Sequence, residues 1–124
     1  MSNSDKSPIA KKIFILEDNE DLRELYTIIF DQHYELESFT TIAQFMRHID
    51  RVPDLYLLDV MLPDGDGVSV CQQLKNNPKT ANIPVIMISA HQHHAEIAKR
   101  CPWSNFIEKP FDIDKLEEMV AKNL

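Results

Sequence analysis

An apolar run ends in an acid at Leu55-Tyr56-Leu57-Leu58-Asp59. Consecutive apolar residues of this kind are typical of a strand that is buried on both faces, as in a parallel sheet. Three further short apolar runs have the same form, at residues 13–16, 85–88 and 106–107, and each also leads into polar residues. A fifth run, residues 34–39, alternates as a half-exposed strand does. The chain therefore contains five candidate strands.

Segments with helical spacing of apolar residues follow all five runs. They lie at residues 20–31, 42–49, 68–74, 91–100 and 112–120. Thr41 and Gln44 form a candidate capping box for the second segment, and Asp112 is a candidate N-cap for the last. This alternation predicts the α/β class: a single doubly wound (βα)5 domain with a five-stranded parallel sheet covered on both faces.

Composition limits the function classes that the chain can serve. The 124 residues suffice for one domain with an ordinary core. With 13 basic and 20 acidic residues, the net charge of −7 disfavours direct binding to nucleic acid or to an anionic membrane. The two glycines, Gly65 and Gly67, cannot form a dinucleotide-binding fingerprint or a P-loop.

Cys71 and Cys101 form no C-x-x-C motif, so we expect neither a disulfide scaffold nor a zinc site, and Cys71 is interpreted as a small core residue. The chain has no long apolar run and no secretion signal, which favours a reducing, cytoplasmic location. Residues 1–10 are predicted to be a disordered arm ahead of a domain at residues 11–124. His91, His93 and His94 are expected to be solvated rather than a metal cluster.

Polar side chains stand just past the ends of four of the predicted strands: Glu17, Asp18, Asp59, Ser89 and Lys109. The carboxyl ends of parallel strands share one edge of the sheet, where α/β proteins bind ligands, so these residues should converge. Three crowded carboxylates repel one another unless a cation lies among them, and oxygen ligands favour Mg²⁺. A carboxylate beside Mg²⁺ can accept a phosphoryl group as an aspartyl phosphate.

The sequence resembles the receiver domain of response regulators, the phosphorylated half of two-component signalling. Four motifs carry the resemblance, in order and spanning residues 11–124: Ile-Phe-Ile-Leu-Glu17-Asp18, Leu-Leu-Asp59-Val-Met-Leu-Pro63-Asp-Gly65-Asp-Gly67, Ile-Ser89-Ala90 and Phe106-Ile-Glu-Lys109-Pro110-Phe111. The resemblance implies a flavodoxin-like sheet of order 2-1-3-4-5. The acidic pair is Glu-Asp where the family more commonly has Asp-Asp.

The resemblance also implies a role for each matching residue at the metal site. Asp59 is the implied phosphoacceptor. Asp18 and Asp59 are implied as direct ligands of Mg²⁺, with Mn²⁺ as a substitute. Glu17 is implied to act through water, and the backbone carbonyl of Met61 completes the protein ligands.

Three further residues are implied to respond to phosphorylation. Lys109 contacts the acceptor carboxylate and then the phosphoryl group, the Ser89 hydroxyl shifts to bond that group, and Phe106 turns inward. The Lys109-Pro110 peptide bond is expected to be cis. The implied protein is a signalling switch, and not a conventional enzyme, that assists its own phosphorylation and dephosphorylation.

The expected partners follow from this interpretation. The phosphodonor is a histidine kinase or a histidine phosphotransfer protein, and an unidentified downstream protein recognises a face of the domain that phosphorylation changes. We expect no direct contact with nucleic acid or membrane, and a monomer or a weak, phosphorylation-dependent dimer.

Two other functions fit parts of the sequence. Asp64-Gly65-Asp66-Gly67-Val68 echoes the signature of haloacid-dehalogenase-type phosphatases, with Asp64 and Asp66 as the reactive acids. That family places its nucleophile after the first strand, so this stretch is better interpreted as a turn that starts a helix. A flavin-binding domain of similar architecture would need a hydroxyl-rich phosphate loop after the first strand, where this chain has acids.

Overall fold

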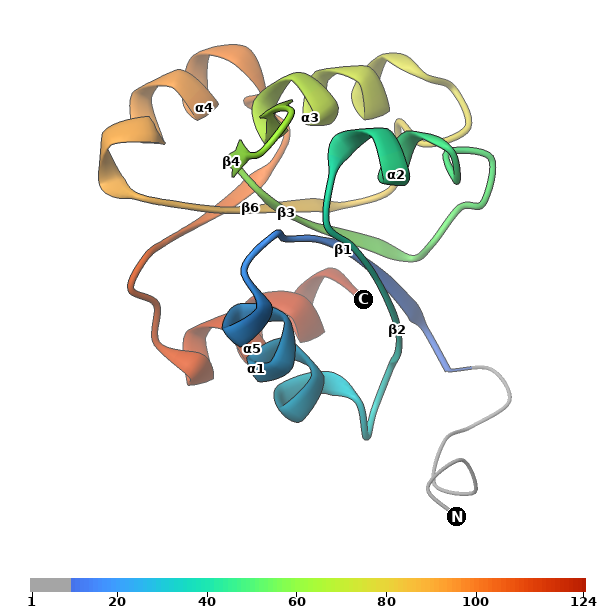
Figure 1. The fold of residues 1–124 in the computed structure, drawn as a ribbon, viewed down its shortest axis with the longest axis vertical. Coiled ribbons are helices and arrows are strands. Elements are labelled where there is room, and N and C mark those ends of the chain that lie inside the picture. Colours follow the sequence, from blue (N-terminus) through green and yellow to red (C-terminus); the bar gives the residue numbers. More distant parts are fainter. Residues whose placement is uncertain (1–9) are drawn as a thin grey trace.

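A computed structural model describes residues 10–124 of the chain. The predicted arm, residues 1–10, therefore lies almost wholly outside the described residues. The structure contains one five-stranded parallel sheet, formed by β1 (Lys12–Leu16), β2 (Glu35–Phe39), β3 (Leu55–Asp59), β6 (Val85–Ser89) and β7 (Asn105–Glu108). The strands lie in the order β2-β1-β3-β6-β7, which confirms the predicted order 2-1-3-4-5 and places β3 at the centre (Figure 1).

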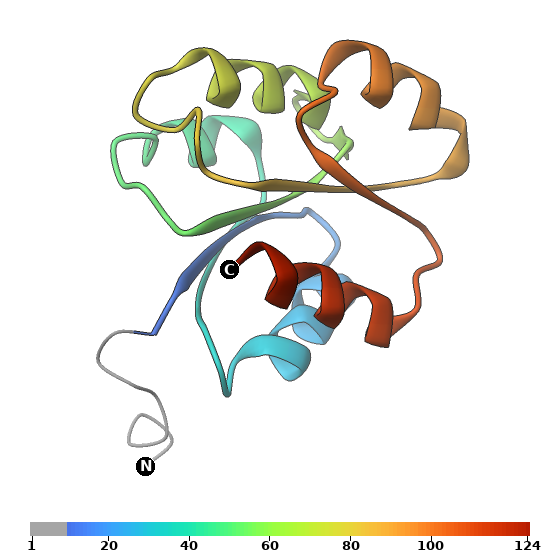
Figure 2. The same ribbon diagram turned by 180° about the vertical axis from the view of Figure 1, so that it is seen from behind.

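Five α-helices cover the two faces of this sheet: α1 (Glu20–Phe30), α2 (Ile42–Met46), α3 (Gly67–Asn76), α4 (His94–Arg100) and α5 (Ile113–Asn123). Helices α1 and α5 lie on one face, and α2, α3 and α4 lie on the other (Figures 1 and 2). Each strand supplies apolar side chains to both faces, because successive side chains point to opposite sides of the sheet. Thus Ile13 and Ile15 pack toward α1 and α5, whereas Phe14 and Leu16 join the core beneath α2, α3 and α4.

Local capping fixes where several helices begin. The Thr41 side chain accepts a hydrogen bond from the Gln44 N–H, and Asp112 caps α5 through the Asp114 N–H. The Gln44 side chain accepts from the N–H of Thr40 at 2.8 Å, one residue earlier than a standard capping box requires. Both helix starts thus use the capping residues that the sequence indicated.

Three details differ from the sequence-based expectation. Helix α2 ends at Met46, so Ile49 packs against the core from the turns that follow. The segment predicted as one helix at 91–100 begins as a 3₁₀ turn, η2 (His91–His93), before α4. A two-residue hairpin, β4 (Met61–Leu62) with β5 (Gly65–Asp66), precedes α3, where only a turn was predicted.

The expectation that the cysteines form no disulfide was wrong. Cys71 of α3 and Cys101 at the end of α4 are joined by a disulfide bond, with Cα atoms 6.4 Å apart. Spacing along the chain could not indicate this pair, because the packing of α3 beside α4 brings the two residues together. Cys71 does lie in the core, with no exposed surface.

Within residues 10–124, no helix combines the length and the apolar character that a membrane span requires.

Candidate functional site

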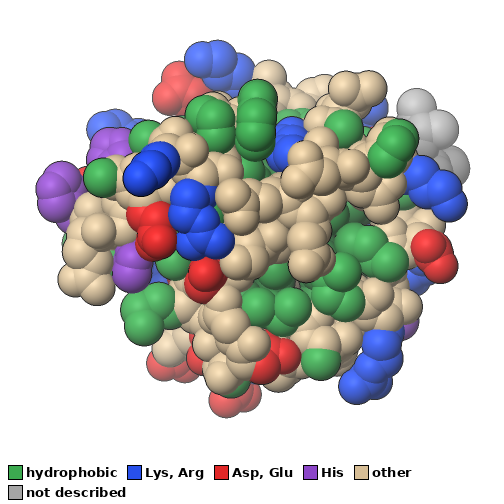
Figure 3. All heavy atoms as spheres, turned by 90° about the horizontal axis from the view of Figure 1, so that it is seen from above, with side chains coloured by type: hydrophobic (Ala, Val, Ile, Leu, Met, Phe, Trp, Pro, Cys, Tyr) green, Lys and Arg blue, Asp and Glu red, His purple; other side chains and the backbone are tan. Residues whose placement is uncertain are grey.

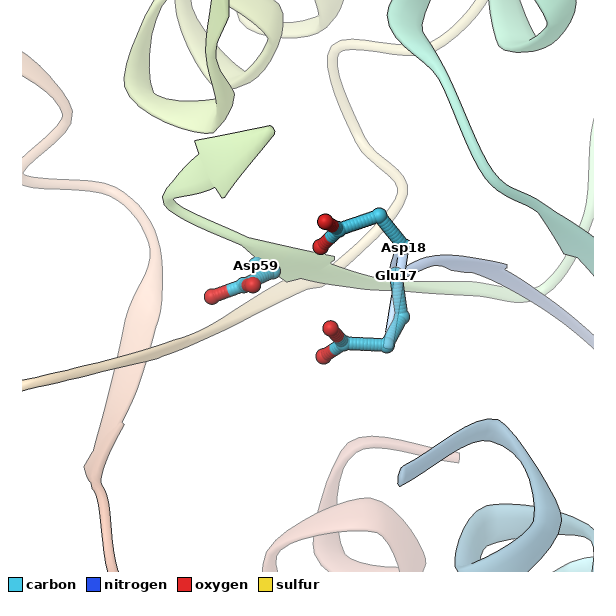
Figure 4. A group of neighbouring side chains, drawn as sticks. All are labelled: Glu17, Asp18 and Asp59. Atoms are coloured by element: carbon cyan, nitrogen blue, oxygen red, sulfur yellow. The ribbon is translucent and has the colours of Figure 1, made fainter. Parts of the chain in front are cut away.

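The carboxyl ends of β1 and β3 bring three carboxylates together at one edge of the sheet. Glu17 and Asp18 follow β1, and Asp59 ends β3. One carboxylate oxygen from each residue lies within 4.8 Å of the others. In Figure 4 the three carboxylates point in the same general direction, with Asp18 above and Glu17 below the level of Asp59. Glu17 and Asp59 are buried, whereas Asp18 is exposed, so the cluster is open to solvent on one side.

Lys109 supplies positive charge at this cluster. Its Nζ lies 3.2 Å from Asp59 Oδ1 and 4.0 Å from Glu17 Oε1. The Lys109 N–H donates to the Ser89 carbonyl at 2.8 Å, which holds the lysine backbone at the end of β6. The following peptide bond to Pro110 is cis, as expected. One ammonium facing three carboxylates leaves the formal charge of the group negative, which favours a further cation.

The Asp59 carboxylate is held in a fixed orientation. Its Oδ1 accepts the Val60 N–H at 2.8 Å as well as the Lys109 ammonium. The residue is only 7% exposed, so these donors are not replaced freely by water. A carboxylate with a set direction and a neighbouring cation is well placed to react along one line of approach.

Glu17 carries the strongest electrostatic perturbation in the cluster. Burial, followed by the negative charge of Asp59, raises the pKa of Glu17 from 4.5 to about 7, although Lys109 and the Asn19 N–H oppose the rise. The Tyr26 hydroxyl donates to Glu17 Oε1 at 3.5 Å, and burial beside that carboxylate raises the pKa of Tyr26. A divalent cation among these oxygens would favour the ionised form of Glu17, so the donor set fits Mg²⁺ or a similar hard ion.

A pocket of about 100 Å³ lies beside Asp59. It is lined by residues from the ends of β3, β6 and β7 and from η2: Asp59, Val60, Met61, Ser89, Ala90, His93 and Lys109. The Ser89 hydroxyl, buried in this wall, donates to the Ala90 carbonyl at 3.3 Å. The pocket thus places a hydroxyl and an ammonium around a space next to the Asp59 carboxylate. His93, expected to be solvated, forms part of this wall.

Phe106 lies outside that pocket. Its ring stacks on His94 with centroids 4.4 Å apart, and it borders a neighbouring pocket of about 220 Å³ with Ile97 and Cys101. The side chain is half-buried. The structure therefore brings Glu17, Asp18, Asp59, Ser89, Met61 and Lys109 into one site and places Phe106 in the adjoining layer.

Two supporting residues were not identified from the sequence. Arg23 of α1 donates from Nη1 to the backbone carbonyls of Glu17 and Asp18, at 3.1 and 2.9 Å, and so fixes the acidic loop. Gly67 donates its N–H to the Val60 carbonyl at 2.7 Å, and a Cβ there would lie 1.9 Å from the Asp59 carbonyl oxygen. Gly67 belongs to the motif that follows Asp59 in the sequence, so its importance could have been inferred there. No motif or local pattern in the sequence indicates the role of Arg23.

Asp64 and Asp66 lie outside the carboxylate cluster. Asp64 accepts the Ile42 and Ala43 N–H groups at the start of α2, at 2.9 and 3.0 Å, which lowers the pKa of Asp64. Asp66 caps α3 through the Ser69 N–H at 2.8 Å. Both acids serve helix starts, and the phosphatase alternative that used them is not supported.

Comparisons with known proteins agree with this geometry. The family model described as the response regulator receiver domain matches residues 13–121. Response regulator PleD of Caulobacter vibrioides is 32% identical over 84% of the chain, and the phosphate regulon regulator PhoB of Rhizobium meliloti is 31% identical over 91%. These matches cover 24% and 52% of PleD and PhoB, so the chain spans only part of these relatives.

Solved structures give the same result. The signal receiver domain of a signal transduction histidine kinase from Syntrophus aciditrophicus superposes with a TM-score of 0.86 at 28% identity, over 93% of this chain and 90% of that domain. NtrX from Brucella abortus superposes with a TM-score of 0.79 at 28% identity, over 94% of this chain and 27% of NtrX. With the family model covering nearly all the described residues, the chain belongs to the response regulator receiver domain family.

Proposed function

We propose that residues 11–124 form a phosphoacceptor switch of a two-component system, in which Asp59 takes a phosphoryl group from a histidine kinase or a histidine phosphotransfer protein. The observation that carries this proposal is the environment of Asp59. Its buried carboxylate ends the central strand, 3.2 Å from the Lys109 ammonium and beside the carboxylates of Glu17 and Asp18. Phosphoryl transfer depends mainly on positioning and on neutralisation of charge, and these groups could supply both.

In the proposed reaction, an Asp59 oxygen attacks the phosphorus of the donor phosphohistidine. The new P–O bond forms as the P–N bond breaks, and the donor imidazole leaves. Lys109 stands beside the acceptor carboxylate, where its charge would stabilise the incoming phosphoryl oxygens. Ser89 lines the same pocket and would exchange its bond to the Ala90 carbonyl for one to a phosphoryl oxygen.

The residues proposed to hold Mg²⁺ are Asp18 and Asp59 directly, Glu17 through water and Met61 through its backbone carbonyl. Their oxygen donors and net negative charge suit this ion, and Mn²⁺ has similar requirements. When bound, the ion would neutralise charge on the phosphoryl group during transfer. The chain's own carboxylates would then be relieved of their mutual repulsion, which is strongest between Glu17 and Asp59.

Phosphorylation adds charge in a small pocket whose wall includes the start of the η2–α4 segment. We propose that Ser89 and Phe106 transmit this change to the surface around α4 and β7, where a downstream protein would bind. The half-buried Phe106 ring borders a pocket beside Ile97 and Cys101, into which the ring has room to shift. The domain is proposed to act in the cytoplasm, as a monomer or a weak dimer.

The direct test is the intact mass of the protein after incubation with Mg²⁺ and a small-molecule phosphodonor such as an acyl phosphate. We expect the mass of one added phosphoryl group, lost in Asp59→Asn and in the presence of a chelator. Asp64→Asn serves as the matched control, because that acid caps α2 away from the pocket. Undiminished labelling of Asp59→Asn would overturn the assignment of the acceptor.

A further inference from the structure

The disulfide between Cys71 and Cys101 joins two helices of the same face. Cys71 lies within α3, and Cys101 is the residue at which α4 ends. Helices α3 and α4 run side by side over the sheet, away from α1 and α5 (Figures 1 and 2). Both cysteines are fully buried. The bond therefore fixes the C-terminal end of α4 to the neighbouring helix.

Hydrogen bonds between α3 and the end of α4 lie close to the disulfide bond in the sequence. Arg100 donates from Nη2 to Ser69 Oγ at 3.0 Å and to Gln72 Oε1 at 3.2 Å, and the Gln72 amide returns a bond to the Arg100 carbonyl at 3.1 Å. These hydrogen bonds can exchange with water when α4 moves, because their residues lie partly at the surface. The disulfide cannot exchange in this way, so it restrains movement at the C-terminal end of α4.

The opposite end of the same segment touches the phosphoacceptor pocket. His93, directly before α4, lines the 100 Å³ pocket with Asp59, Ser89 and Lys109. Histidine side chains gather over this end of the face, at the left of Figure 3. The η2–α4 segment thus has one end at the site of phosphorylation and the other at the disulfide. A conformational change that begins at Asp59 would therefore act on α4, whose C-terminal end is held by the disulfide bond.

Cys101 lies next to a small pocket, although the residue itself has no exposed surface. It forms part of the wall of the 220 Å³ pocket that contains His94, Ile97, Pro102 and Phe106. A local movement of the end of α4 that opens this pocket wall would expose the Cys101 sulfur to a thiol or disulfide of low molecular weight. Cys71 lies within α3 and does not line this pocket, so we expect Cys101 to be the first sulfur to react.

We propose that Cys71 and Cys101 are a redox modification site that controls how freely α4 moves, with low-molecular-weight disulfides as the oxidant and the corresponding thiols as the reductant. In oxidation, the Cys101 thiolate attacks a disulfide such as oxidised glutathione and releases one thiol. The Cys71 thiolate then displaces the second thiol from Cys101. Two protein thiols lose two protons and two electrons in all, and one small disulfide becomes two thiols.

The functional consequence rests on the proposed function. Oxidised protein holds α4 against α3, so phosphorylation at Asp59 moves this segment less. Reduced protein releases the C-terminal end of α4 and lets the same phosphorylation act on a mobile helix. The chain would then respond fully to its phosphodonor only under reducing conditions.

The first experiment measures the redox state of the folded, full-length chain. The protein is equilibrated in glutathione buffers of graded ratio, denatured in an alkylating reagent and weighed. We expect no label at the oxidising end and two labels at the reducing end, with a midpoint between them. Two labels in every buffer, or none in any buffer while the protein remains folded, would overturn the proposal.

The second experiment measures amide hydrogen exchange of residues 94–100 in oxidised and reduced protein, and again after treatment with Mg²⁺ and an acyl phosphate. We expect exchange in α4 to be about tenfold faster when the protein is reduced, and the increase on phosphorylation to be larger in that form. Cys71→Ala should show the fast rate in every buffer. Equal exchange rates of residues 94–100 in oxidised and reduced protein would overturn the proposal that the disulfide controls the mobility of α4. The labelling and the first comparison need no phosphorylation, so a failure of Asp59 to accept a phosphoryl group is recognised separately.

Discussion

Glu17→Gln should stabilise the metal-free protein at alkaline pH, because the native fold holds this carboxyl group in surroundings that disfavour its charge. Burial and the neighbouring Asp59 raise the pKa of Glu17 from 4.5 to about 7. A carboxyl group whose pKa is higher in the folded state binds more protons when folded, so stability is lost as pH rises. The loss begins near the unfolded pKa and is complete above the folded one.

The magnitude follows from the two pKa values. Each pKa unit corresponds to about 1.4 kcal/mol, so ionising Glu17 lowers the free energy of unfolding by roughly 3 kcal/mol between about pH 4.5 and pH 8. Glutamine has a similar shape and no charge to ionise. The variant should therefore lack this loss and exceed the wild type in stability by roughly 2–3 kcal/mol near pH 8.

The assay is urea unfolding in the presence of a chelator, at several pH values across this window. Glu24→Gln is the matched control, because Glu24 is an exposed carboxylate of α1 without a place in the cluster. Added Mg²⁺ should restore stability to the wild type at high pH and much less to Glu17→Gln. If Glu17→Gln shows the same dependence of unfolding free energy on pH as the wild type, the Glu17 carboxyl group does not cause the loss of stability.

Three other perturbations test separate parts of the account. Gly67→Ala places a Cβ 1.9 Å from the Asp59 carbonyl oxygen, so the free energy of unfolding in urea should fall by about 2 kcal/mol or more, and the extent of phosphorylation should fall with it. An unchanged urea midpoint would contradict this close approach. Lys109→Met removes the ammonium 3.2 Å from Asp59 and should slow phosphorylation by a small phosphodonor about 100-fold. A phosphorylation rate within about threefold of the wild type, which is on the order of experimental scatter, would show that Lys109 does not stabilise the transfer. Reduction of the disulfide, which closes a loop with a sequence separation of 30, should lower the free energy of unfolding by roughly 3–4 kcal/mol, while Cys71→Ala should be insensitive to reductant.

The sequence predicted the architecture well because the strands are apolar on both faces and the helices carry one apolar stripe. That pattern admits few arrangements other than a covered parallel sheet. Glu17, Asp59 and Lys109 were recognisable because each lies at or directly after the carboxyl end of a strand, and parallel strands end at the same edge. Their convergence is a consequence of topology rather than of local sequence.

Features that depend on contacts between distant helices were not predictable in this way. The disulfide depends on how α3 lies against α4, and the hydrogen bonds from Arg23 to the acidic loop depend on one side-chain rotamer. The place of His93 in the pocket wall depends on the 3₁₀ turn that precedes α4. Each is set by tertiary packing, which periodicity and motif spacing do not describe.

The central claim is that the carboxylates of Glu17, Asp18 and Asp59 jointly bind a divalent cation. The most direct test is a crystal structure of the protein grown with Mn²⁺, with the ion located by its anomalous scattering. We expect one strong peak among the three carboxylates, adjacent to the Asp59 pocket and absent from crystals of Asp18→Asn grown in the same way. Mn²⁺ bound elsewhere on the chain, with these three side chains turned away from one another, would contradict it.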